Sequence, residues 1–145
     1  MKKVISVLLL IILIMTGFTA CNSDENKIED FEWELGKAMN IEKEGLMVAL
    51  GEEDTAYPDA EIVDVLLTAN DGSIVIEDKT NGKTYEGAYE EMYVTDSNDD
   101  YKIIIKGKEG YVNVSRTIYQ DGREVPTLIL TIDGYDMYFY ERTDK

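Results

Sequence analysis

The chain has 145 residues, no histidine, a single cysteine and a formal net charge of −16 at pH 7. Without histidine it has no Ser-His-Asp or Cys-His catalytic set and no histidine metal site. With one cysteine it can form neither an internal disulfide nor a zinc site. The acidic excess repels phosphate backbones, which argues against a nucleic-acid partner.

The first twenty residues have the order found in an export signal. Lys2 and Lys3 form a positively charged head, residues 4–18 are almost entirely apolar, and small residues lead up to Cys21. A helix over the apolar run would cover only ~22 Å, whereas the hydrocarbon core of a bilayer is ~30 Å thick. The sequence therefore predicts a signal peptide over residues 1–20 rather than a membrane span.

The segment Phe18-Thr19-Ala20-Cys21 closely resembles the lipobox of bacterial lipoproteins. The resemblance implies cleavage before Cys21 and a diacylglyceryl group on its sulfur; Phe18 departs from the pattern, since a lipobox more often has Leu there. The alternative is an incidental thiol after an ordinary signal. Two acyl chains give lasting anchoring. The mature protein is therefore expected on the extracytoplasmic face of the cell membrane, anchored through Cys21.

From Cys21 to Asp30 the chain is polar and acidic, so residues 21–30 are expected to be an acylated cysteine and a flexible tether. The rest, residues 31–145, has the length of a single domain. It begins with Phe31, Trp33 and Leu35 alternating with glutamates. This alternation predicts a strand with an aromatic inner face.

The next stretch, residues 37–50, fits two interpretations. Its apolar residues could line one face of a helix, or residues 46–50 could form a buried strand. Gly45 interrupts the helical pattern without settling the choice. Residues 51–60 are expected to be a loop.

From Glu61 onward, short apolar runs alternate with turn signals such as Asp71-Gly72 and Asp133-Gly134. No connection is long enough for a crossover helix, so neighbouring strands are expected to pair antiparallel. With the strand at Phe31 the count is eight, or nine if residues 46–50 join. Closure into a barrel would remove the exposed edges. The sequence thus predicts an all-β, antiparallel up-and-down meander of about eight strands. The seven expected strands after Glu61 cover residues 62–69, 73–77, 83–94, 101–106, 111–119, 125–132 and 135–142.

This arrangement resembles the lipocalin-like barrels of small bacterial lipoproteins. The residues that carry the resemblance are Trp33 on the first strand, the Asp71-Gly72 hairpin, the segment Gly87-Ala88-Tyr89 and Arg142 at the end of the last strand. In lipocalins an arginine from the end of the barrel packs against that tryptophan, so the resemblance implies a cation–π contact between Arg142 and Trp33. Lipocalins have glycine two residues before the tryptophan, where this chain has Phe31.

Tyrosines supply the candidate ligand site. Tyr85 and Tyr89 share one face of an expected strand, and Tyr101 lies on the next. If these faces point inward, the interior suits a small hydrophobic or aromatic ligand. The alternatives are a barrel filled by its own side chains and a tyrosine ladder on the surface. The candidate ligand-binding residues are Trp33, Tyr85, Tyr89, Tyr101 and Arg142.

No recognisable catalytic set is present. Ser73 lacks the Gly-x-Ser-x-Gly frame of a nucleophile elbow, and there is no phosphate-binding glycine loop. The acidic run at residues 96–100 fails as an EF-hand, because Tyr101 and Gly107 replace its required Gly and Glu. That leaves only a weak surface calcium site as an option. The prediction is therefore a protein that is not an enzyme and has no cofactor and no metal site.

Two functions remain. The leading hypothesis is a lipid-anchored, non-catalytic binding module that takes up a small hydrophobic or aromatic molecule in its barrel. The alternative is a protein-interaction or cell-envelope accessory protein that uses its acidic surface and has a filled barrel. An interior cavity of at least ~300 Å³ would favour the first hypothesis.

Overall fold

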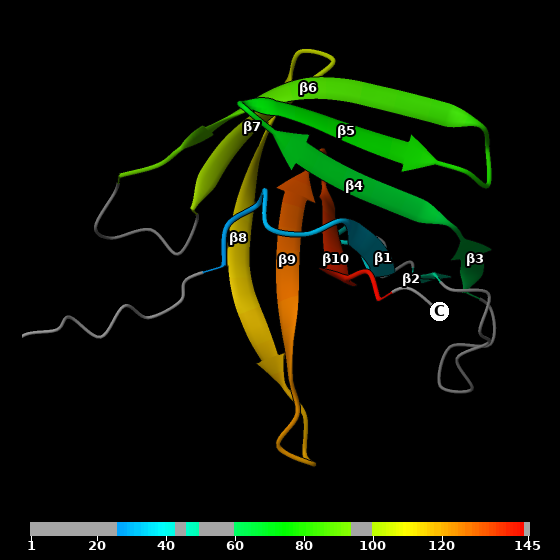
Figure 1. Cartoon of the computed structure of the whole chain (residues 1–145). Helices are drawn as coiled ribbons and strands as arrows, with labels where there is room; N and C mark the ends of the chain where they lie inside the picture. The colour runs from blue at the N-terminus through cyan, green and yellow to red at the C-terminus, as the bar shows by residue number, and fades with distance from the viewer. Residues whose placement is uncertain (1–25, 43–45, 50–59, 94–99, 144–145) are drawn as a thin grey trace, which may run out of the picture.

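A computed structural model describes residues 26–42, 46–49, 60–93 and 100–143 (Figure 1). These residues contain ten strands, all in one sheet, and no helix. The strands are β1 (Trp33–Asn40), β2 (Leu46–Ala49), β3 (Glu61–Val63), β4 (Val65–Asn70), β5 (Ser73–Asp78), β6 (Lys83–Glu91), β7 (Tyr101–Ile105), β8 (Lys108–Ile118), β9 (Glu124–Ile132) and β10 (Tyr135–Glu141).

Eight of these strands close into an antiparallel barrel. From β4 to β10 each strand pairs with the next, and β1 joins the two ends of this series by pairing with both β10 and β4. The β1–β10 ladder runs from Trp33↔Glu141 to Asn40↔Tyr135, with a bulge at Gly36. The predicted all-β, up-and-down barrel of about eight strands is confirmed, and it is consistent with the lipocalin-like type.

In the ambiguous stretch over residues 37–50, the described residues form the end of β1 and one further strand, β2. Within its described part, β2 pairs antiparallel with the second half of β1 and parallel with β3. Only Asp64 separates β3 from β4. Its N–H donates to the hydroxyl of Thr80 (2.6 Å) instead of joining a ladder. The predicted strand over residues 62–69 is therefore interrupted, and β2 lies between β1 and β3.

Antiparallel connectivity gives the barrel two different ends. The open end carries the β5–β6, β7–β8 and β9–β10 turns. The closed end carries the β4–β5 and β8–β9 turns, the start of β1 and the end of β10, because Trp33 pairs with both Leu67 and Glu141. In Figure 1 residues 26–32 (blue) run across this closed end before entering β1.

Residues 26–30 are part of the folded barrel, although the sequence assigned them to a tether. The Ile28 side chain is fully buried and belongs to the hydrophobic core. The carboxylate of Glu29 accepts hydrogen bonds from the Tyr89 hydroxyl and from the backbone N–H of Asp71 (3.0 Å). Residues 26–30 therefore seal the closed end of the barrel. Ile28 is a single apolar residue in a polar run, so it forms no periodic pattern from which the sequence could have revealed this seal.

Two glycines let the strands approach closely at the inner face. A Cβ added at Gly87 would overlap the carbonyl oxygen of Ile104, and one at Gly110 would lie 2.7 Å from the carbonyl oxygen of Thr131. Glycine at such points permits the sharp coiling that closes a small barrel. Gly110 lies buried within β8, which begins earlier than the expected strand over residues 111–119; the turn before it is Lys106-Gly107, with both residues at positive φ.

Candidate ligand cavity at the open end of the barrel

The interior of the barrel is divided between a filled closed half and an open half with a cavity. Large side chains occupy the closed half, where Trp33 packs edge-on against Phe31 (ring centroids 5.3 Å apart) and Tyr101 packs edge-on against Tyr89 (5.7 Å). Phe139 is also fully buried. A cavity of about 410 Å³ lies near the open end.

The walls of this cavity are aliphatic. They belong to strands on all sides of the barrel, which places the cavity on the axis rather than in a surface groove. The sequence-predicted alternation puts these residues on the inner faces of their strands. The apolar lining consists of Leu35, Val63, Val65, Ile76, Ile105, Ile132 and Met137.

Charged and aromatic residues ring the mouth. Asp78 accepts hydrogen bonds from the backbone N–H (3.0 Å) and the side-chain amide (2.8 Å) of Asn81. Lys108 forms an ion pair with Asp133. These two pairs fix the positions of their side chains at the rim of the cavity. The other rim residues are Glu61, Tyr85, Lys106 and Tyr135.

Lys106 is the rim cation that lies over an aromatic ring. Its Nζ is 4.3 Å from the centroid of the Tyr85 ring. Lys106 and Gly107 have φ values of 50° and 76°, which correspond to a two-residue type I′ hairpin turn. Lys106 follows β7 and Tyr85 lies on the paired strand β6, so a positive charge and an aromatic ring lie side by side at the mouth.

The structure places one of the five predicted ligand residues in the cavity. Tyr85 lines it, whereas Trp33, Tyr89 and Tyr101 lie in the closed half and are not among its lining residues. Arg142 lies at the outer end of β10, where its Nη1 is 3.0 Å from a carboxylate oxygen of Glu32.

The predicted cation–π contact between Arg142 and Trp33 is wrong. Among the described residues, cation–π contacts are made by Lys37, Lys106 and Arg123. The Trp33 ring is fully buried and its Nε1 donates to the carbonyl oxygen of Ile28 (2.8 Å). The Phe31 ring and the Ile28 seal cover the tryptophan, so the arginine stays outside.

Sequence reasoning missed most of the cavity residues, among them Met137, Tyr135 and Lys106. The alternation shows which side chains point inward but not how far along the axis they lie. A usable signal was present in the turns. Alternate hairpin turns gather at one end of an up-and-down barrel, so residues beside the 79–82, 106–107 and 133–134 turns were predictable neighbours.

In the part of the chain that the structure describes, no group of three or more His, Cys, Asp or Glu residues could hold a metal ion. No helix within the same residues is long and apolar enough to cross a membrane. Of the acidic run that was considered for calcium and set aside, Asp100 is described, and its carboxylate accepts a hydrogen bond from the backbone N–H of Val114 (2.6 Å). Residues 96–99 and Cys21 lie outside the described residues.

Comparison with known proteins gives no match for this chain among protein-family models, curated proteins or solved structures.

Proposed function

We propose that this protein is a lipid-anchored, extracytoplasmic binding protein of lipocalin-like type, which takes up a small hydrophobic or aromatic molecule through the open end of its barrel. The observation that carries the proposal is the cavity of about 410 Å³. Binding pockets for small molecules measure about 300–1,000 Å³ and are mostly apolar with a few polar groups. The cavity fits that description in both size and lining.

The rim narrows the ligand class. The aliphatic walls suit an apolar body, while Tyr85 and Lys106 at the mouth offer a ring face and a positive charge to the part of the ligand nearest to solvent. A small molecule with an apolar or aromatic body that enters end-on satisfies both regions. A strongly hydrophilic molecule would make no apolar contacts with the walls and would lose its own hydration.

Binding without catalysis is the role we infer. Of the three carboxylates at the rim, that of Asp78 is engaged by Asn81 and that of Asp133 by Lys108, which leaves Glu61 without the second free carboxylate that a catalytic acid–base pair would need. The cavity also favours ligand capture over an accessory role with a filled barrel. In this proposal the partners are the membrane, through lipid on Cys21, and the small molecule.

Ligand binding is tested with the soluble domain, residues 22–145, purified from its host without detergent. Native mass spectrometry is expected to show an extra mass that denaturation releases. Titration with the apolar fluorophore N-phenylnaphthylamine then compares two variants on β7. Ile105→Trp fills the cavity from its wall, whereas Ile104→Trp adds the same ring on the outer face, where Ile104 is 47% exposed.

We expect Ile105→Trp to weaken fluorophore binding by about tenfold or more, equivalent to ~1.4 kcal/mol, and Ile104→Trp to leave it unchanged. The new indole at position 105 would pack over its cross-strand partner Gly87, so the variant is expected to fold. Equal binding by both folded variants would contradict the cavity as the site. The anchor is tested separately by growing cells with a labelled fatty acid and measuring its incorporation into the protein. Cys21→Ser should abolish this incorporation.

A further inference from the structure

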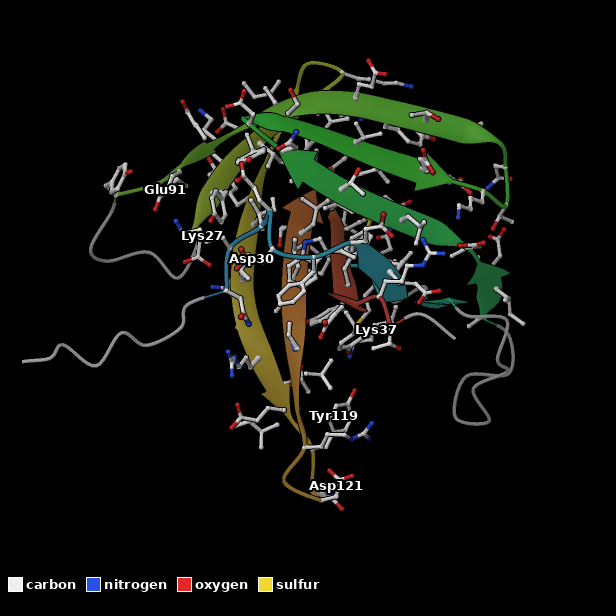
Figure 2. All side chains as sticks on the ribbon, in the orientation of Figure 1. Lys27, Asp30, Lys37, Glu91, Tyr119 and Asp121 are labelled. Carbon is white, nitrogen blue, oxygen red and sulfur yellow. The ribbon has the colours of Figure 1, made fainter. Side chains whose placement is uncertain are left out.

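The β8–β9 hairpin extends well beyond the barrel wall. The β7–β8 ladder ends at Tyr101↔Val112 and the β9–β10 ladder ends at Tyr140↔Thr127, but β8 and β9 remain paired as far as Ile118↔Glu124. Residues 113–126 therefore form a two-stranded ribbon of their own. Figure 1 shows this ribbon projecting from the barrel, and Figure 2 shows Tyr119 and Asp121 at its far end.

The far end of this ribbon, residues 115–126, exposes apolar side chains. Ile118 is 70% exposed and Tyr119 is 39% exposed. The guanidinium of Arg123 lies 4.7 Å from the centroid of the Tyr119 ring. An exposed aliphatic residue beside a tyrosine and an arginine is a combination that suits the boundary between apolar and polar phases.

The net charge of residues 115–126, called the tip from here on, differs from that of the whole protein. The tip carries two of the three arginines of the chain, Arg116 and Arg123, against Asp121 and Glu124, so it is formally neutral in a chain of net charge −16. The acidic body is repelled by anionic lipid headgroups. The tip is therefore the part of the closed end that can approach such a surface at the lowest electrostatic cost.

The tip and the N-terminal segment leave the barrel at the same end. Arg116 Nη2 donates to the side-chain oxygen of Asn26 (3.4 Å), which places the start of the described chain beside the ribbon. Cys21 is five residues before Asn26. Five extended residues reach about 17 Å, which is more than the ribbon extends beyond Arg116, because β8 ends at Ile118 and the chain then turns back to Arg123.

We propose that the tip of the β8–β9 hairpin rests on the membrane surface that holds the lipid anchor, so that the protein has two points of attachment. The inference depends on the proposed lipidation of Cys21. A weak contact suffices because the anchor makes it intramolecular, at a high effective concentration. The two contacts lie at the closed end of the barrel and direct the mouth of the cavity away from the membrane.

The test uses the acylated protein in vesicles of phosphatidylcholine and phosphatidylglycerol, with Cys21 blocked by its lipid. A single environment-sensitive fluorophore is attached through Ile118→Cys or, as the matched control, through Ile104→Cys on the barrel wall. We expect the probe at position 118 to shift to the blue and to be quenched by lipids that carry a nitroxide near the headgroup. The probe at position 104 should show neither change.

Flotation of the vesicles separates the two proposals. If the protein floats with the vesicles but the probe at position 118 remains unquenched, the anchor stands and the hairpin contact is overturned. If the protein does not float, the anchor is overturned, and the hairpin contact with it. The blue shift at position 118 could instead depend on the surface density of the protein and not be accompanied by quenching from nitroxide lipid. That result would assign the tip to a contact with a second protein molecule and overturn the membrane contact. Adding Tyr119→Asp and Arg123→Glu should abolish the quenching without detaching the protein.

Discussion

The indole N–H of Trp33 donates a hydrogen bond to the carbonyl oxygen of Ile28 across 2.8 Å, and both side chains are fully buried. This bond joins the first strand of the barrel to the segment that seals its closed end. A carbonyl buried without a partner would cost about 1–3 kcal/mol, so the indole makes the seal possible at this position. Among the described residues, large side chains fill this end of the barrel, and the cavity lies toward the other end.

Trp33→Phe is expected to destabilise the protein by about 2–4 kcal/mol, because it removes the hydrogen bond to Ile28 and leaves a void beside the smaller ring. Urea unfolding followed by circular dichroism measures the loss. Arg142→Ala is the comparison, since its ion pair with Glu32 is partly exposed and should contribute less than ~1 kcal/mol. Similar losses in the two variants would contradict this account of the closed end.

Gly87→Ala is expected to destabilise the barrel by about 2 kcal/mol or more, because the added Cβ would overlap the carbonyl oxygen of Ile104 and push β6 from β7. Ala88→Ser on the same strand is the control, since residue 88 faces outward and is exposed. The free energies of unfolding of the two variants give the comparison. A loss below about 0.5 kcal/mol for Gly87→Ala would show that the strands can separate without strain.

The sequence predicts the barrel well because its signals are local. Alternation assigns faces, and dipeptides such as Asp71-Gly72 and Asp133-Gly134 adopt the positive φ values that tight hairpins need. Antiparallel pairing follows from the short connections. These features require no knowledge of distant contacts.

The remaining features depend on long-range contacts. The strand break at Asp64 depends on a hydrogen bond that its N–H donates to the hydroxyl of Thr80, sixteen residues away in sequence. The placement of Tyr101 in the closed half depends on register, which alternation leaves undetermined. Arg142 was assigned by resemblance alone, and its actual partner Glu32 is one of many acidic residues that could have taken that place.

Tyr101 should make the stability sensitive to alkaline pH. Burial raises the pKa of this phenol; a hydrogen bond from the Ile28 backbone acts in the opposite direction, and nearby negative charges, first that of Glu91, add to the rise. A folded-state pKa above the unfolded value of about 10 means that this contribution is fully present below pH ~10 and is lost as the pH rises through the folded value.

The measurement for Tyr101 is the free energy of unfolding from about pH 8 to pH 11 for the wild type and for Tyr101→Phe. The difference between the two proteins should be constant up to about pH 9 and should then shrink, because only the wild type loses stability by ionising this phenol. Lysines titrate in both proteins, so their effect cancels in the difference. Parallel curves over the whole range would mean that the phenol ionises without disturbing the fold.

Sodium chloride should raise the melting temperature of the soluble domain. Omitting residues 1–20 takes away Lys2 and Lys3 and moves the formal charge from −16 to −18. The five ion pairs of the described residues are partly or well exposed and contribute little, so repulsion among carboxylates outweighs them. Raising the salt to ~0.3 M shortens the Debye length to well under ~10 Å and screens that repulsion. A gain of ~1 kcal/mol would shift the melting temperature by about 4 °C.

Charge neutralisation separates screening from other effects of salt. Glu77→Gln with Glu86→Gln removes two exposed charges from neighbouring strands on the outer face. The double variant is expected to melt higher than the wild type at low salt and to gain less from added salt, because less repulsion remains to be screened. Potassium chloride should act as sodium chloride does. A wild-type melting temperature that stays constant or falls with added salt would show that repulsion among the surface carboxylates does not destabilise the barrel.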